Sequence, residues 1–66
     1  MKFNTKAFKK FRAEKDLSME VVAKKVRMSY PKIFGIEHGT VDPKMKEIKR
    51  FAELFECNEG DFIIFQ

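Results

Sequence analysis

The side chains that could do chemistry in this 66-residue sequence are mostly cationic, and they are concentrated in its first half. Residues 1–34 carry ten lysines and arginines against three acidic residues, a net charge of +7, whereas residues 35–66 carry four against seven, a net charge of −3. A basic half beside a mildly acidic one indicates a face that binds a polyanion. A solvated, lysine-rich surface would give the same counts, so charge alone leaves both interpretations open.

Side chains suited to catalysis or metal binding are scarce. His38 and Cys57 are each the only residue of their type, on different predicted helices, and the glycines form no phosphate-binding loop. No acidic pair lies in an apolar pattern that would raise a pKa. One cysteine excludes a disulfide framework and a multi-cysteine metal site, and Cys57 is most simply a small core residue. We therefore expect no enzyme activity, no metal, no cofactor and no small-molecule ligand.

The hydropathy pattern bears on location. No apolar run approaches the roughly 18 residues of a membrane-spanning helix, and the first ten residues lack the apolar stretch of a signal peptide. A basic first helix with Phe8 and Phe11 would suit a membrane surface, but the core needs these rings. We expect a cytoplasmic protein that neither crosses nor binds a membrane.

Five short helices must position the cationic side chains. Apolar spacing and capping residues predict a first helix that ends near Leu17, a second over about 19–26 and a third over about 30–38. A fourth helix contains the strongest apolar periodicity, and a short fifth helix follows it. The residues expected to cap or stop these helices are Asn4 or Thr5, Ser18, Ser29, Gly39, Asp42 as N-cap with Pro43 at the first helical position, and Asn58 with Asp61. The sequence predicts one all-α domain over residues 1–66.

The spacing of the second and third helices carries the functional information. Only Arg27, Met28 and Ser29 separate them, so two short helices must cross steeply. One of them can then lie across a phosphate backbone while the other enters a major groove. An ordinary corner of a small helical bundle has the same spacing, and geometry alone slightly favours that interpretation.

The stretch LSMEVVAKKVRMSYPKIFGIEHGTVDP resembles the Cro/repressor-type helix-turn-helix (Cro/C1-type, lambda repressor-like, XRE family). No single motif in it is highly specific, but the joint spacing is. The likeness extends upstream to Phe8 and downstream to Phe62, which is nearly the whole chain. The residues that match are Leu17, Ser18, Val22, Ala23, Val26, Ser29, Ile33, Ile36, Glu37, Gly39 and Pro43.

This resemblance implies a five-helix lambda repressor-like domain that binds double-stranded DNA at an operator and regulates transcription, usually as a homodimer. It implies a structural ion pair between Arg12 and Glu37, which joins the first helix to the end of the third. A repressor of prokaryotic, phage or mobile-element origin fits this description. We expect base reading by Tyr30, Pro31, Lys32, Phe34 and His38. We expect phosphate binding by Ser18, Ser29, Thr40 and Lys44, with Lys9, Lys10, Lys24 and Lys25 nearby.

The third helix departs from the family pattern. A helical wheel turns Ile33 and Ile36 inward and places Phe34 and Gly35 beside the outward Pro31 and His38, although base edges are usually read by Arg, Gln, Asn or Lys. Met19 stands where relatives commonly have a phosphate-contacting Gln. In one interpretation Phe34 packs on a thymine methyl and Gly35 allows close approach to DNA.

In the alternative, the apolar face with Pro31 and Phe34 binds a protein, as an antirepressor would. The basic half of the sequence favours DNA over a protein partner.

The C-terminal tail contains four consecutive apolar residues, Phe62, Ile63, Ile64 and Phe65. A helical end buries only part of such a run. Met1 and Phe3 could form a short strand against the remainder, or a second subunit could cover it. We predict a homodimer through this C-terminal surface.

Overall fold

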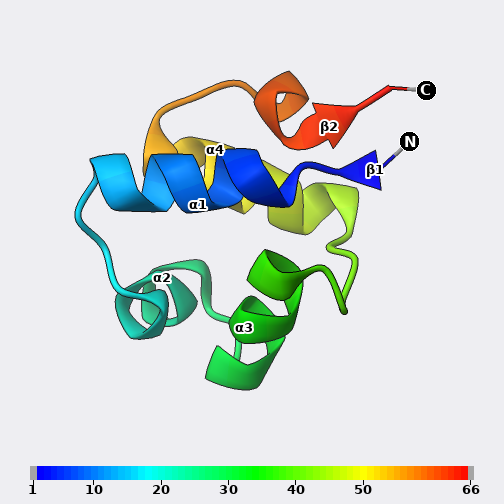
Figure 1. The fold of residues 1–66 in the computed structure, drawn as a ribbon. Coiled ribbons are helices and arrows are strands. Elements are labelled where there is room, and N and C mark those ends of the chain that lie inside the picture. The colour runs from blue at the N-terminus through cyan, green and yellow to red at the C-terminus, as the bar shows by residue number, and fades with distance from the viewer. Residues whose placement is uncertain (1, 66) are drawn as a thin grey trace.

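The structure, a computed structural model, describes residues 2–65 and is mainly helical. The elements in chain order are β1 (Lys2–Phe3), α1 (Thr5–Glu14), α2 (Met19–Val26), α3 (Tyr30–His38), α4 (Met45–Phe55), the 3-10 helix η1 (Glu59–Phe62) and β2 (Ile63–Ile64). Figure 1 shows α2 and α3 on one side of α1, with β1 and β2 together near the two chain ends. The predicted helix-turn-helix architecture is confirmed, and the fifth helix is a short 3-10 turn.

Local side-chain caps begin the first three helices. Asn4 Oδ1 accepts a hydrogen bond from the Ala7 N–H at 3.1 Å, so Asn4 rather than Thr5 is the N-cap of α1. Ser18 and Ser29 cap α2 and α3 in the same way. Each cap supplies an acceptor for an N–H group that has no partner within its helix. The predicted starts of these helices are confirmed. They could be predicted because capping depends on residues only three positions apart.

The predicted start of α4 is wrong. Its N-cap is Lys44 rather than Asp42, and Pro43 precedes the helix instead of occupying its first position. The first turn depends on Glu47, whose Oε1 accepts from the Lys44 N–H at 2.8 Å. A lysine side chain has no acceptor, so the glutamate supplies only the returning half of a capping box. The helix therefore starts where Glu47 can reach back, two residues after the predicted N-cap.

Phe62 lies at the centre of the core. Its side chain is fully buried, and its ring centroid lies between 5.6 and 6.5 Å from those of five other phenylalanines. Those rings belong to Phe3, Phe8, Phe11, Phe51 and Phe55. Phe62 was predicted to lie in a dimer interface, and this is wrong: η1 turns it inward, where no second subunit can reach it.

The two chain ends pair as a short antiparallel sheet. Phe3 is opposite Ile63 in the register, and the Asn4 N–H donates to the Phe62 carbonyl at 2.6 Å. The expected strand against the tail is therefore present at Phe3, while Met1 lies outside the described residues. Phe65 remains 78% exposed. The apolar tail is thus divided between the core and the surface. No helix within residues 2–65 has both the length and the apolar character needed to cross a membrane.

We expect Phe62→Ala to lower the free energy of unfolding by about 3–5 kcal/mol, because it removes a buried ring from a packed cluster. In dilute solution, where the expected homodimer dissociates, Phe65→Ala is the matched control and should change the free energy of unfolding by less than about 0.5 kcal/mol, since its ring is exposed. Urea denaturation followed by circular dichroism measures both values. Equal losses in the two variants would contradict the central position of Phe62.

Candidate functional site

A tight turn joins α2 to α3. The α2 helix ends at Val26, and its C-cap is Arg27, whose φ of 59° lies in the left-handed region. The Met28 N–H donates to the Ala23 carbonyl at 2.9 Å, as in a helix-ending Schellman turn, and Ser29 then opens α3. The apolar faces of the two helices meet in the core. The three-residue turn predicted from the spacing is therefore present, and it leaves the far side of α3 facing outward.

Arg12 ties three segments together beneath α3. Its Nε and Nη2 atoms donate to the two carboxylate oxygens of Glu37 at 2.7 and 3.2 Å, and Nη1 donates to the Leu17 carbonyl at 2.9 Å. Glu37 is only 4% exposed. A buried carboxylate is stable when it is paired and hydrogen-bonded, so this fork holds α1, the loop after α1 and the end of α3 in one arrangement.

The outward face of α3 is aromatic. Tyr30 and Phe34 are 43% and 45% exposed, and Pro31 and His38 are also exposed. The rings of Phe34 and His38 stack with their centroids 4.0 Å apart and their planes at 18°. We call the side chains of Tyr30, Pro31, Phe34 and His38 the α3 face. Four of the five expected base-reading residues thus lie together on one side of the helix.

Gly35 does not lie on this face. The wheel placed it outward, but it is buried, and a Cβ at this position would lie 2.6 Å from the Val41 Cγ2 atom. Its carbonyl accepts from the Thr40 and Val41 N–H groups at 2.8 and 3.2 Å. The absence of a side chain therefore admits the chain after α3, and the expectation that it admits DNA is wrong. Since Glu37 is buried too, α3 is rotated by roughly 30° from the wheel placement.

Lys32 is also directed elsewhere. Its Nζ forms an ion pair with Glu47 Oε2, so it points toward α4, away from the α3 face. Burial by itself raises the pKa of Glu47, but the hydrogen bonds from Lys32 and from the Lys44 N–H, with the charges of both lysines, outweigh burial and lower it. The assignment of Lys32 to base reading is therefore corrected: its ammonium group neutralises a buried carboxylate.

The expected phosphate-binding residues all lie at the surface. The hydroxyl oxygens of Ser18 and Ser29 accept from backbone N–H groups, which leaves each hydroxyl hydrogen available to donate. Thr40 is exposed, and its Oγ1 donates to the Gly35 carbonyl at 3.3 Å. The exposed lysines of the set have no ion-pair partner among residues 2–65. They are Lys9, Lys10, Lys24, Lys25 and Lys44.

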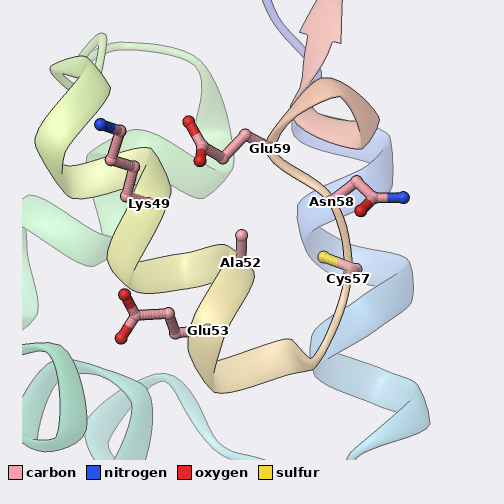
Figure 2. A pocket seen from close by; sticks show the side chains of 6 residues that line it. All are labelled: Lys49, Ala52, Glu53, Cys57, Asn58 and Glu59. Atoms are coloured by element: carbon pink, nitrogen blue, oxygen red, sulfur yellow. The ribbon is translucent and has the colours of Figure 1, made fainter.

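An open cavity of about 300 Å³ lies elsewhere, between α4 and the segment that leads to η1. Figure 2 shows Cys57 on that segment, outside any helix, with its sulfur turned toward α4. Burial and the charge of Asp61 raise the pKa of the Cys57 thiol, against a smaller lowering by Lys15. A protonated thiol is a poor nucleophile. Within the described part of the chain, no three His, Cys, Asp or Glu side chains are grouped to hold a metal ion.

Two contacts that support the α3 face were not anticipated from the sequence. One is the Lys32–Glu47 pair, and the other is the hydrogen bond from Arg50 Nη1 to the Val26 carbonyl at 3.2 Å. Both connect α4 to the α2–α3 unit. Neither has a local sequence signal, because the partners are 15 and 24 residues apart. The apolar periodicity of α4 predicts that one side of the helix is buried, but not which residues Glu47 and Arg50 contact.

The chain matches a known protein family. A helix-turn-helix family model matches residues 8–62, a range that begins inside α1 and ends with η1. The comparison with curated proteins gave no match. The matched range includes the α2–α3 turn, the Arg12–Glu37 pair and the entire α3 face.

We expect Arg12→Ala to lower the free energy of unfolding by about 3 kcal/mol, because it leaves the buried Glu37 carboxylate unpaired. Lys15→Ala is the matched control: Lys15 donates to Glu56 at 2.8 Å in an exposed pair, and its loss should barely change stability. Chemical denaturation of the two variants beside the parent protein provides the comparison. If Arg12→Ala were as mild as the control, water would have to replace the arginine at Glu37.

Proposed function

The chain belongs to the Cro/C1-type helix-turn-helix family of DNA-binding transcription regulators, and we propose that it is a sequence-specific repressor that places α3 in the major groove of its operator. An origin in a prokaryote, a phage or a mobile element accords with this role. The observation that carries the proposal is the α3 face. It is exposed on a helix whose remaining sides are held by the core, by Arg12 and by α4.

The dimensions and rigidity of α3 support this placement. Its nine residues extend about 14 Å, and the major groove, about 12 Å wide, admits one α-helix. Readout requires side chains held in fixed positions on a rigid element. The Arg12–Glu37 and Lys32–Glu47 pairs supply this rigidity at the two flanks of the helix.

Phosphate contacts would come from the edges of the helix-turn-helix unit. The hydroxyls of Ser18 and Ser29 lie at the starts of α2 and α3, where free N–H groups and the helix dipole favour an anion. Lys24 and Lys25 are exposed on α2. Together with Lys9, Lys10, Thr40 and Lys44, these groups would fix the orientation of the protein on the duplex without reading its sequence.

A second candidate function uses the same surface. Exposed aromatic rings such as Tyr30 and Phe34 are typical of sites that bind proteins, so an antirepressor that binds a partner protein through Pro31 and Phe34 is the alternative. The net charge of +7 on residues 1–34 favours DNA, because a polyanion neutralises that charge. Phe34→Ala separates the two functions. It should weaken duplex binding if the α3 face reads DNA, and partner binding if the face binds a protein.

Salt dependence tests the DNA-binding role. Each neutralised phosphate contributes about −0.9 to the slope of log affinity against log salt, so four contacts would weaken binding roughly 100-fold between about 50 and 200 mM salt. Fluorescence anisotropy with a labelled duplex measures the slope. Lys24→Ala should reduce its magnitude by about 1, whereas Lys49→Ala, beside the cavity on α4, should leave it unchanged. A flat salt response would overturn the electrostatic argument.

The exposed end of the tail supports a homodimer. Ile64 is 37% exposed and Phe65 78% exposed, and β2 has only β1 as a partner within residues 2–65. Together with the partly buried Ile63, these residues form the proposed interface. Phe62 is no longer part of it, because its ring is buried in the core. A symmetric dimer could place two α3 helices about 34 Å apart, one turn of DNA.

Sedimentation velocity should show this dimer at micromolar protein concentration. Phe65→Ala should weaken the dimer without unfolding the chain, because the ring lies outside the core. Met45→Ala, which removes another exposed apolar side chain, from α4, should not affect the dimer. A parent protein that sediments as a monomer at high micromolar concentration, with and without DNA, would rule the interface out.

A further inference from the structure

The α3 face is poor in hydrogen-bonding groups. Phe34 and Pro31 have no polar side-chain atom, so the Tyr30 hydroxyl and the His38 ring provide all of its polar side-chain atoms. Lys32, the one lysine of the helix, is paired with Glu47. Guanine presents two acceptors in the major groove and is usually read by an arginine or lysine. A face without a cationic side chain is therefore unsuited to guanine and suited to a base with an apolar group.

The three rings on this face form a continuous row. Tyr30, Phe34 and His38 are spaced four residues apart, and the Tyr30 and Phe34 centroids are separated by 6.4 Å. From the first ring centroid to the last, the row extends at most about 10 Å, which corresponds to roughly three base pairs at 3.4 Å each. Because Phe34 and His38 stack with their centroids 4.0 Å apart, these two rings are close enough together to contact one base pair.

A hydrogen bond determines which nitrogen of His38 is free. Nδ1 lies 2.9 Å from the backbone oxygen of Phe34. A carbonyl oxygen only accepts, so Nδ1 carries the hydrogen and donates. In the neutral ring Nε2 is then an acceptor. Stacking on Phe34 holds the ring in this orientation, so the face presents an apolar ring beside a hydrogen-bond acceptor.

The major groove contains one kind of base pair that matches this combination. Thymine alone among the four bases presents a methyl group, and the amino donors are adenine N6 and cytosine N4. An A·T pair therefore carries both a methyl group and an amino donor, whereas an unmodified G·C pair carries only the donor. We propose that the α3 face reads A·T base pairs, with Phe34 against a thymine methyl group and His38 Nε2 accepting from an adenine amino group.

This inference rests on the proposed function, since it requires α3 to lie in the major groove. It assigns specificity to two side chains that differ from the Arg, Gln, Asn and Lys residues usually found at base edges. It also assigns different atoms of one base pair to Phe34 and His38. The two contacts can therefore be removed one at a time, from the DNA as well as from the protein.

The first experiment selects binding sites from duplexes with a randomised core. We expect the selected duplex to contain A·T pairs at the centre of each half-site. In that duplex, uracil then replaces individual thymines, which removes only the methyl group, and purine replaces individual adenines, which removes only the amino group. We expect about a fourfold loss of affinity for the contacted methyl group, the value for one buried carbon, and a comparable loss for the contacted amino group.

Protein variants assign each loss to a side chain. In Phe34→Ala the uracil substitution should no longer matter, whereas the purine substitution should still weaken binding. His38→Phe keeps a ring for stacking but removes the acceptor, so it should abolish the purine effect alone. Met45→Ala, an exposed change outside α3, is the matched control and should keep both effects. Double-mutant cycles, each combining one protein variant with one base substitution, give the coupling free energy between the side chain and the base group.

The outcomes separate the inference from the function on which it rests. Specific binding to G·C-rich duplexes, or no effect of uracil and purine in the parent protein, would overturn the A·T assignment and leave the DNA-binding role intact. The absence of any salt-dependent duplex binding would overturn both. Retained DNA specificity in Phe34→Ala, with loss of binding to a partner protein, would assign the face to protein recognition. The base substitutions leave the protein unchanged, so this test does not depend on the folding of a variant.

Discussion

A buried carboxylate at the end of α3 constrains the rest of the helix-turn-helix unit. Glu37 is 4% exposed, and a charge in such a position needs a close partner with matching geometry. Arg12 provides two parallel hydrogen bonds to it and a third to the Leu17 carbonyl. Since α3 cannot turn about its axis without breaking this fork, the pair determines which residues of the helix face the solvent.

Two further contacts narrow the outward face of α3. Both lie on the flank opposite Glu37, where Lys32 reaches across to Glu47 and the chain at Thr40 and Val41 packs over Gly35. What remains is a row of aromatic rings. The charged side chains of α3, Lys32 and Glu37, are thus both engaged in ion pairs that stabilise the fold. Base edges are usually contacted by polar side chains. The groups left for recognition are a ring surface, the Tyr30 hydroxyl and the His38 imidazole.

The aromatic core joins the two ends of the chain. Phe62 packs among rings from β1, α1 and α4, and β1 pairs with β2 directly after it. A 66-residue chain buries only about 60% of its surface on folding, so the loss of one central ring affects a large part of its stability. The same arrangement leaves Phe65 at the surface, next to the strand pair. The core and the proposed dimer interface are therefore neighbours in one apolar tail.

The sequence by itself determined the helices and their order. Capping by Ser18 and Ser29 and the left-handed stop at Gly39 depend on residues within one turn, so they could be predicted from local patterns. The resemblance to a known family further implied the Arg12–Glu37 pair, which no local pattern shows. Tertiary structure alone decided the rotation of α3 and the division of the tail between core and surface. Each depends on partners beyond the local pattern: Lys32 with Glu47, Gly35 with Val41, and Phe62 with Phe3 and Phe8. An apolar pattern predicts that a side chain is buried, but only the packed structure shows which neighbour it packs against.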